Sequence, residues 1–585
     1  MAILHPTANT TDRTELVPSH EGPNVFPNCS LFSKLLRHAR RNRLAIRDVN
    51  LSLEKTYGDI LSDALTLRSF IATALGSEII LKIEQGEEVF IGILAAGGYE
   101  FSVAVLAVLA LGAAFVPMTV SVPVKEASYF VTKSRQPLIL VSSEVVELGK
   151  SITSFVSQRG HPVSTLEILP HLPPTPTYEP LQIVLSANRR LDDNRAGLVI
   201  FTSGTTGRPK GAVMRRAYCH EAALAIGEGY DLDHHDVLLH IVPVHHTTGL
   251  GTSFFPFLVA GACIEFKRGS FDPAWIWNRW LTGGFTTFSA VPTIFLRLKW
   301  YFERELAPKL SADDLNRFVQ AANQFRAFMC GSSALPQPVQ DFWTDIRGGR
   351  PILTRYGATE FPGCLKVPAE CGPVPEGCVG LPVPGVELKL SDGDHGELLV
   401  RSPYMFAKYL YDDAATLAAH DEEGYFKTGD IVRRNGPFYF IEGRASVDIL
   451  KSGGYKISAL DLERVALGLP YVNEVAIVGV EDEEFGQRVG AILTLKPNSL
   501  PGNDLKLEKL RQDMRKELAS YKLPTLLRVF GTGELPKGGT GKVQKKILGP
   551  ELFPSNWREI REVQRWERAK DKGPVEQGGH LIARL

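Results

Sequence analysis

The most informative stretch of the sequence reads Gly197-Leu-Val-Ile-Phe-Thr-Ser-Gly-Thr-Thr-Gly-Arg-Pro-Lys-Gly211. Its apolar first half predicts a buried strand over 198–202. The residues after it combine glycines, which let backbone N–H groups approach phosphate oxygens, with hydroxyl donors and a lysine cation. The chain has no Gly-x-x-x-x-Gly-Lys-Ser/Thr pattern, so this is not a Walker A loop. We predict a phosphate-binding loop formed by Thr202, Ser203, Gly204, Thr205, Thr206, Gly207 and Lys210.

Short apolar segments alternate with helical patterns on both sides of this loop. We expect strands over 89–94, 138–142, 237–242, 286–291, 325–330 and 352–355, and helices that include 101–111 and 293–304. This alternation predicts an α/β fold with mainly parallel sheets. Shorter strands from about residue 386 predict a β-rich subdomain, and a small α+β unit follows. We expect domains over 1–443 and 444–550 and a tail over 551–585.

Composition excludes several classes of protein. The 585 residues contain 65 Lys+Arg and 65 Asp+Glu, a balance that argues against nucleic-acid binding. The seven cysteines form no Cys-x-x-Cys pair, so a structural zinc site is not expected. The longest apolar run, 103–118, is interrupted by Gly112 and is too short to span a membrane.

The two ends of the sequence bear on localisation. No apolar signal segment begins the chain, so we do not expect secretion. Three acidic residues within 1–30 disfavour a mitochondrial transit peptide. The last residues, Ala583-Arg584-Leu585, are close to the peroxisomal address Ser-Lys-Leu, so an import receptor is a candidate partner. We expect a peroxisomal or cytoplasmic location. The oligomeric state cannot be predicted from the sequence.

The loop at 202–211 resembles the signature of the adenylate-forming superfamily, which includes acyl-CoA synthetases, peptide-synthetase adenylation domains and firefly-type luciferases. Further motifs of that superfamily follow in order: Leu111–Pro117, Pro243–Gly249, Gly331–Pro336, Arg355–Glu360, Tyr425–Asp430, Gly443-Arg444, Lys451–Lys456 and Pro536–Lys542. The resemblance implies a large N-terminal domain that binds ATP and a carboxylic acid, and a small mobile C-terminal domain. It also implies that CoA is the second substrate.

The resemblance assigns the nucleotide and its metal to particular residues. Tyr356 offers an aromatic face to adenine, Asp430 accepts from the ribose hydroxyls, Thr359 donates to the α-phosphate, and Glu360 binds Mg²⁺ through oxygen. The remaining implied contacts with ATP or AMP are Gly331, Ser332, Ser333, Gly357 and Arg444.

The resemblance also assigns the two half-reactions. Lys542 is implied to bridge the carboxylate and the α-phosphate, where it would stabilise growing negative charge. His246 is implied to contact the carboxylate of the acid. The C-terminal domain then turns about a hinge near 446–447. This motion brings in the CoA-binding residues Lys451, Gly453, Gly454 and Tyr455.

Residues 443–460, 485–495 and 291–298 are similar to malonyl- and methylmalonyl-CoA synthetases (the acyl-CoA synthetase family member 3 group), which makes these the nearest branch. There, an arginine at the place of Arg297 pairs with the distal carboxylate of a short dicarboxylate. The alternative is a helix-surface arginine beside Lys299. The resemblance places Ala358 and Phe361 beside the acyl group.

Two departures from that branch leave the acid open. His246 is followed by Thr-Thr-Gly, and Glu360 is followed by Phe-Pro-Gly-Cys. A medium-chain fatty acid or a specialised-metabolite acid is therefore an alternative substrate. Two further hypotheses are an enzyme that loads a carrier protein and a catalytically silent binding protein. The intact Lys210, Glu360, Asp430, Arg444 and Lys542 argue against the silent protein.

Overall fold

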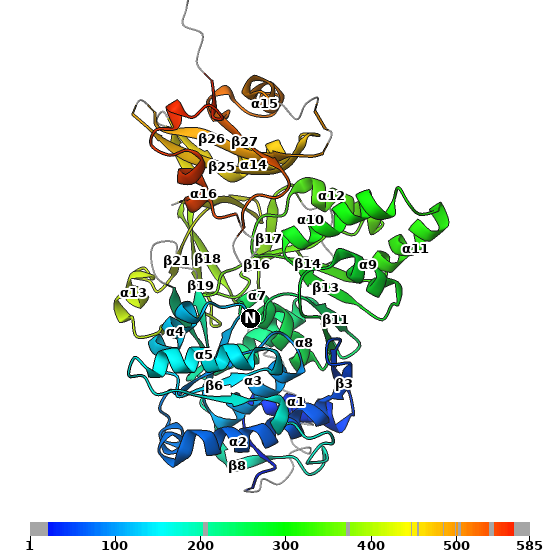
Figure 1. Ribbon diagram of the computed structural model, residues 1–585, viewed down its shortest axis with the longest axis vertical. Coiled ribbons are helices and arrows are strands. Elements are labelled where there is room, and N and C mark those ends of the chain that lie inside the picture. Colours follow the sequence, from blue (N-terminus) through cyan, green and yellow to red (C-terminus); the bar gives the residue numbers. More distant parts are fainter. Residues whose placement is uncertain are drawn as a thin grey trace, which may run out of the picture. The chain divides into compact units, whose positions relative to one another are not determined.

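The computed structural model describes residues 22–202, 209–369, 375–445, 447–452, 455–483, 485–497, 499–500, 505–537 and 543–566 (Figure 1). It divides into two compact units. The first comprises the residues up to Thr428 together with 432–441. The second comprises 429–431 and the residues from Glu442 onward. Several predicted site residues lie outside the described ranges: Ser203, Gly204, Thr205, Thr206, Gly207, Gly453, Gly454 and Lys542. The terminal tripeptide 583–585 also lies outside the described ranges.

The first sheet of the first unit contains the strand that precedes the loop motif. Its seven strands follow the order β20 (Lys408–Tyr409), β10 (Lys210–Arg215), β9 (Ala196–Thr202), β5 (Ala114–Met118), β4 (Phe90–Leu94), β6 (Leu138–Val141) and β7 (Ser164–Glu167). The strands from β9 to β7 are parallel, which confirms the predicted α/β pattern. β10 and β20 add an antiparallel edge.

A thirteen-stranded sheet forms the rest of the framework. Its order is β18 (Glu387–Asp392), β19 (His395–Arg401), β21 (Phe426–Asn435), β22 (Phe438–Arg444), β17 (Cys378–Pro382), β16 (Leu365–Lys366), β15 (Leu353–Tyr356), β14 (Ala327–Cys330), β13 (Thr287–Ala290), β11 (Val237–His240), β12 (Cys263–Phe266), β2 (Leu44–Asp48) and β3 (Leu53–Thr56). It is parallel from β2 to β15, and β16 joins β15 in antiparallel fashion. The β-rich segment therefore extends this sheet instead of forming a separate one.

Helices cover the sheets and supply the core. In the first unit they are α1 (Ser30–Arg40), α2 (Tyr57–Glu84), α3 (Tyr99–Leu111), α4 (Val124–Lys133), α5 (Val146–Ser157), α6 (Glu221–Glu228), α7 (Thr247–Gly249), α8 (Phe255–Ala260), α9 (Pro273–Leu281), α10 (Pro292–Tyr301), α11 (Ala312–Asn323), α12 (Gln337–Ile346) and α13 (Asp413–Ala418). α3 is buried along its whole length and ends at Gly112 in a left-handed conformation that favours glycine. α9 to α12 lie beside β13 and β14, where Trp277, Trp280 and Trp343 fill a second core (Figure 1).

α2 is long and apolar enough to span a membrane by length and composition, although the sequence predicted no span. Its first half is buried in the core through residues such as Ile60, Leu61 and Leu65. The backbone leaves helical geometry at Gly76. The buried first half of α2 therefore belongs to the core of the first unit.

The second unit is a six-stranded sheet with helices. Its strands are β24 (Tyr455–Ser458), β23 (Ile449–Ser452), β26 (Gly486–Leu495), β27 (Leu526–Thr532) and β28 (Gln564–Arg565), with β25 (Val472–Asp482) paired to β26. Its helices are α14 (Ala459–Leu467), α15 (Leu507–Met514) and α16 (Lys545–Leu552). β28 pairs with β27, and Trp557 is buried. The predicted start of the tail at 551 is therefore too early, because residues up to 566 pack into this unit.

Candidate active site

β9 and β10 bring the two ends of the loop motif together. Thr202 and Lys210 are register partners in this antiparallel pair. The Thr202 hydroxyl donates a hydrogen bond of 3.3 Å to the Lys210 carbonyl. The Lys210 ammonium lies 4.9 Å from the ring centroid of Tyr409, which is a cation–π distance. The two ends of the predicted phosphate loop are thus adjacent, and a positive charge lies at one of them.

Tyr409 connects this lysine to Glu360. Its hydroxyl donates a hydrogen bond of 2.8 Å to Glu360 Oε1, and its side chain is buried. The Phe406 backbone N–H donates a hydrogen bond of 2.8 Å to the Glu360 carbonyl. Hydrogen bonds therefore fix both the main chain and the side chain of Glu360. Tyr409 belongs to none of the motifs that the sequence singled out. Only its position on β20, paired with β10, brings it to both residues.

A tight turn presents Thr359 and Glu360 at the end of β15. A Cβ at Gly357 would lie 2.8 Å from the Gly363 Cα, so only glycine fits there. The Ala358 N–H donates to the Phe361 carbonyl at 3.0 Å and closes the turn. Phe361 is 1% exposed and packs against Tyr356, with ring centroids 5.8 Å apart. The side chain thus belongs to the core of the first unit, and its contact with the acid stays a prediction.

Ser332 has an uncommon backbone conformation, with φ at 75°. Its hydroxyl lies 2.8 Å from the Thr248 hydroxyl, so two motifs distant in the sequence meet here. A Cβ at position 331 would lie 3.0 Å from Arg355 Cγ on β15. This close packing explains why residue 331 is a glycine. The neighbouring Ser333 is exposed. Left-handed non-glycine residues are concentrated at functional sites, so Ser332 is a good candidate.

His246 begins the short helix α7. The Thr248 N–H donates to its Nδ1 at 3.4 Å. A neutral imidazole with Nδ1 as acceptor carries its proton on Nε2, so Nε2 can donate to a carboxylate. Burial lowers the pKa of the adjacent His245 to about 4, so that ring is neutral. The buried His240 ring donates a hydrogen bond of 3.0 Å to the carbonyl of Gly249, the last residue of α7.

Arg297 lies on α10 and is half-buried. Its guanidinium carbon is 5.8 Å from the ring centroid of Phe271. Lys299 on the same helix forms an ion pair with Glu303 and lies over Phe342. The two cations thus contact different neighbours, and Arg297 is not a fully solvated surface residue.

Asp430 and Arg444 form a two-point ion pair in the second unit. The Arg444 Nε donates to Asp430 Oδ1 at 2.7 Å, and Nη2 donates to Oδ2 at 3.2 Å. Asp430 is buried. Both carboxylate oxygens therefore already accept a hydrogen bond, and ribose hydroxyls would share them with the guanidinium.

Two of the predicted CoA residues, Lys451 and Tyr455, lie on the paired strands β23 and β24 of the second unit. The Lys451 N–H donates to Gln487 Oε1 at 3.0 Å, and Ser452 is the register partner of Tyr455. The exposed Tyr455 ring stacks on Tyr521, with centroids 4.3 Å apart. The sequence did not single out Tyr521, because the stack joins residues far apart in the chain.

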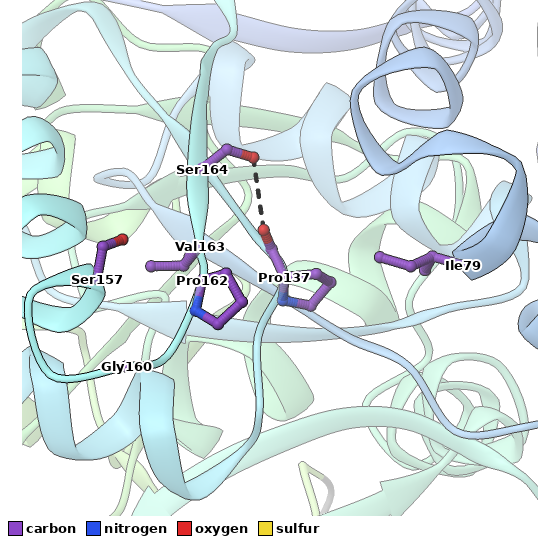
Figure 2. A pocket seen from close by; sticks show the side chains of 7 residues that line it. All are labelled: Ile79, Pro137, Ser157, Gly160, Pro162, Val163 and Ser164. Carbon is purple, nitrogen blue, oxygen red and sulfur yellow. Dashed lines mark hydrogen bonds between the residues drawn. The ribbon is translucent and has the colours of Figure 1, made fainter.

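An open hollow lies elsewhere on the first unit, and Figure 2 shows the side chains around it. Ile79, Pro137, Pro162 and Val163 line most of it, with Ser157 and Ser164 as the hydroxyl-bearing side chains. No charged residue lines this hollow, and none of the candidate residues does. Its chemistry does not suit a triphosphate.

The structure therefore brings together four groups of predicted residues. In the first unit, Thr202, Lys210 and Glu360 converge through Tyr409, and Ser332 meets the His246 segment through Thr248. In the second unit, Asp430 pairs with Arg444. Lys451 and Tyr455 share one hairpin there.

Comparison with known proteins identifies two family regions in the chain. The family described as AMP-binding enzyme matches residues 42–410. The family described as AMP-binding enzyme C-terminal domain matches residues 461–542. The first region contains the candidate residues from Thr202 to Phe361 and the second contains Lys542, whereas Asp430, Arg444 and the predicted CoA residues lie between the two matched regions.

Individual relatives align over most of the chain. The mitochondrial malonate–CoA ligase ACSF3 of Bos taurus is 32% identical over 577 residues, which are 92% of this chain and 93% of that protein. A CoA ligase of Gibberella moniliformis is 31% identical and covers 81% of this chain and 86% of its own length. The crystal structure of ATP-bound MatB from Rhodopseudomonas palustris has a TM-score of 0.73 at 23% identity, covers 90% of this chain and 99% of its own, and has the same fold.

Proposed function

The chain belongs to the AMP-binding enzymes of the adenylate-forming superfamily and is an AMP-forming acid–CoA ligase, and we propose that its acid is a short dicarboxylate such as malonate or methylmalonate. In the first step the carboxylate attacks the α-phosphate of ATP, and acyl-AMP and diphosphate form. In the second step the CoA thiol displaces AMP, and acyl-CoA forms. The observation that carries the choice of acid is the alignment with a malonate–CoA ligase over 92% of this chain.

Arg297 is the residue proposed to select the second carboxylate. Its guanidinium is half-buried beside Phe271, and an aromatic neighbour restricts its orientation. A planar guanidinium binds a carboxylate through two parallel hydrogen bonds. An acid without a second carboxylate cannot form these two hydrogen bonds with the guanidinium, so such a site favours dicarboxylates.

Each unit is proposed to supply contacts with ATP or AMP. Tyr356 and Gly357 would contact adenine on one side, and Gly331, Ser332 and Ser333 on the other. Asp430 and Arg444 would bind the ribose, and Thr359 the α-phosphate. The loop from Thr202 to Lys210 would surround the remaining phosphates.

Glu360 fits a Mg²⁺ ion by its chemistry. Among the described residues only its Oε1 accepts a hydrogen bond, from Tyr409, so Oε2 is left for a cation. Carboxylate oxygen is a preferred ligand of Mg²⁺, which usually keeps several waters and binds substrate phosphates as well. When bound, the ion would neutralise phosphate charge.

We expect Tyr409→Phe to raise the Mg²⁺ concentration needed for half-maximal activity about 10-fold or more. The change removes the hydroxyl that orients Glu360 and keeps the aromatic ring beside Lys210. Loss of such an outer hydrogen bond typically weakens metal affinity by about 10–100-fold. Tyr411→Phe is the matched control, because Tyr411 is exposed and its ring lies over Arg135. An equal Mg²⁺ requirement in both variants would contradict the role of Glu360.

His246 and Lys542 are proposed to act on the carboxylate during the first step. His246 would contact one carboxylate oxygen and orient the other toward phosphorus. Lys542 would stabilise the charge that grows on the phosphoryl oxygens. For the second step, Lys451, Gly453, Gly454 and Tyr455 would contact CoA.

AMP release with ATP, Mg²⁺ and CoA, measured over a panel of acids, tests the substrate. The panel compares malonate and methylmalonate with acetate, hexanoate, octanoate, longer fatty acids and aromatic acids. We expect turnover of the two dicarboxylates to exceed that of every monocarboxylate. Preference for a monocarboxylate would overturn the dicarboxylate proposal and keep the reaction. Acyl-AMP formation without CoA-dependent AMP release would favour the loading of a carrier protein.

We also propose a peroxisomal or cytoplasmic location. The support is the Ala583-Arg584-Leu585 terminus, which is close to the address that the peroxisomal import receptor binds. Deletion of these three residues from a fluorescent fusion should move it from peroxisomes to the cytosol. Punctate mitochondrial signal in both forms would contradict this proposal.

A further inference from the structure

Arg355 is a buried cation that has no carboxylate partner in the described part of the chain. It lies on β15 directly before Tyr356, and it is 8% exposed. Its Nη2 donates a hydrogen bond of 2.9 Å to Ser289 Oγ, and its Nη1 lies 4.0 Å from the Met329 sulfur. Neither partner carries a negative charge, and no described carboxylate forms an ion pair with Arg355. Buried charges are normally paired, so this arginine is unusual for a core residue.

Two other buried arginines show how a guanidinium is satisfied elsewhere in this chain. Arg347 donates to three main-chain carbonyls, and Arg511 donates to two. Such carbonyl oxygens accept the N–H groups and partly balance the charge. Arg355 donates to no described carbonyl, so its charge is balanced by neither of the usual means.

Lys366 adds a second cation on the same face of the sheet. It is the register partner of Arg355 on β16, so both side chains point to one side of the antiparallel pair. Its Nζ lies 5.0 Å from the ring centroid of Tyr230 and donates to the Gly229 carbonyl. Burial lowers the pKa of Lys366, and the exposed Asp231 offsets this only in part. Like charges directly opposite each other destabilise a strand pair, so this arrangement favours an anion close by.

Two hydroxyl groups next to the guanidinium are available as donors. The Tyr230 hydroxyl is buried, and no described atom is in hydrogen-bond geometry with it. Burial raises the pKa of Tyr230 and Arg355 opposes this rise, which shows that the guanidinium is near the hydroxyl. Ser289 Oγ accepts from Arg355 and, at 3.3 Å, from Ser253 Oγ, so its own proton is available. A guanidinium and two hydroxyl donors suit a carboxylate.

This cluster lies beside the candidate residues of the first unit. A Cβ at position 331 would lie 3.3 Å from Arg355 Nε, so the guanidinium is close to the main chain of Gly331. Ser253 lies in the helical segment directly after α7, which His246 begins. Ser289 and Arg355 are each the third residue of a four-residue strand in the parallel part of the sheet, near its carboxyl end. Ligands of open α/β sheets bind at this edge.

We propose that Arg355, together with Ser289 and Tyr230, binds the second carboxylate of the acid and is a further specificity-determining residue beside Arg297. This inference rests on the proposed function. A carboxylate bound here would pair with a buried charge that water and salt screen little. An acid without a second anionic group would leave that charge unpaired and the hydroxyl donors unused, which a buried site disfavours. The cluster would therefore favour short dicarboxylates over monocarboxylates.

The first test is Tyr230→Phe, which removes the hydroxyl and keeps the ring beside Lys366. Because this hydroxyl has no described hydrogen-bond partner in the protein, its loss should not lower the melting temperature. We expect kcat/KM for malonate, measured as AMP release with ATP, Mg²⁺ and CoA, to fall about 10-fold, because a hydrogen bond to a charged group is lost. The kcat/KM for hexanoate should not fall.

The second test is Arg355→Met, with Arg347→Met as the matched control for the loss of a buried arginine. We expect the ratio of kcat/KM for malonate to that for hexanoate to fall about 10²-fold in Arg355→Met, while the KM for ATP is unchanged. Arg355→Lys should restore part of the malonate activity, because it returns the charge without the planar fork. Arg347→Met should lower stability and leave the ratio unchanged, because its hydrogen bonds are to main-chain carbonyls outside this cluster.

A lower malonate-to-hexanoate ratio in both Tyr230→Phe and Arg355→Met supports the inference, and Tyr230→Phe decides it alone if Arg355→Met does not fold. Equal losses on both acids, or an unchanged ratio, overturn it. Hexanoate turnover that responds to added chloride or phosphate in the unmodified enzyme, and not in Arg355→Met, would show that the cluster binds a free anion, which also overturns it. If the unmodified enzyme prefers a monocarboxylate, the proposed function fails before any variant is compared, and this inference fails with it.

Discussion

Lys542→Ala should lower the rate of acyl-AMP formation about 10²–10³-fold while ATP binding is retained. The carboxylate and the α-phosphate are both anions, and charge grows on the phosphoryl oxygens as the new bond forms. A cation that meets this charge in the transition state contributes mainly to kcat. Diphosphate release under single-turnover conditions measures the step directly.

Thioester formation from supplied acyl-AMP provides the internal control for Lys542→Ala. The proposed role involves only the first half-reaction, so the second should proceed at a rate close to that of the unmodified enzyme. Lys546→Ala is the control for the loss of a lysine from this region. Unchanged acyl-AMP formation in Lys542→Ala would show that the role implied by the family resemblance is wrong for this chain.

Arg297→Leu should reverse the preference between acids. We expect kcat/KM for malonate to fall about 10²-fold or more, because its second carboxylate would then be desolvated beside an apolar side chain. The kcat/KM for hexanoate should stay the same or rise, since a leucine side chain favours an apolar acyl chain. The ratio of the two kcat/KM values is the measurement.

Lys299→Leu on the same helix is the matched control for Arg297→Leu. Lys299 is paired with Glu303 and lies over Phe342, so its loss should not change the ratio of acids. An equal loss on malonate and hexanoate in Arg297→Leu would make Arg297 structural. The medium-chain or specialised-metabolite acid would then become the leading substrate.

Much of the framework was predictable from local patterns. The strands expected at 89–94 and 198–202 are β4 and β9, and the helix expected from residue 293 is α10, which begins at Pro292. These elements are short apolar segments or helices with clear start signals, so local physics decides them. The packing of 551–566 was not predictable, because Trp557 and β28 find their partners in distant parts of the chain.

The residues of the candidate site also fall into those that a local motif predicted and those that only the fold brought into contact. Lys210, Tyr356, Glu360 and Asp430 were identified because each belongs to a contiguous motif. Tyr409 was not, because it belongs to no motif and meets Glu360 and Lys210 only in the folded chain. Phe361 was assigned to the acid by its place in a motif; the structure shows that it is buried, and its contact with the acid stays a prediction.

The sequence by itself determined the family, the reaction class and the identity of the motif residues, because glycines, hydroxyls and charges at fixed spacing record a chemical requirement directly. Only the tertiary structure decided how those residues are held. The Tyr409 bridge between Lys210 and Glu360 and the hydroxyl contact between Thr248 and Ser332 both join segments far apart in the chain. Long-range contacts of this kind depend on strand order and packing, which no local pattern specifies.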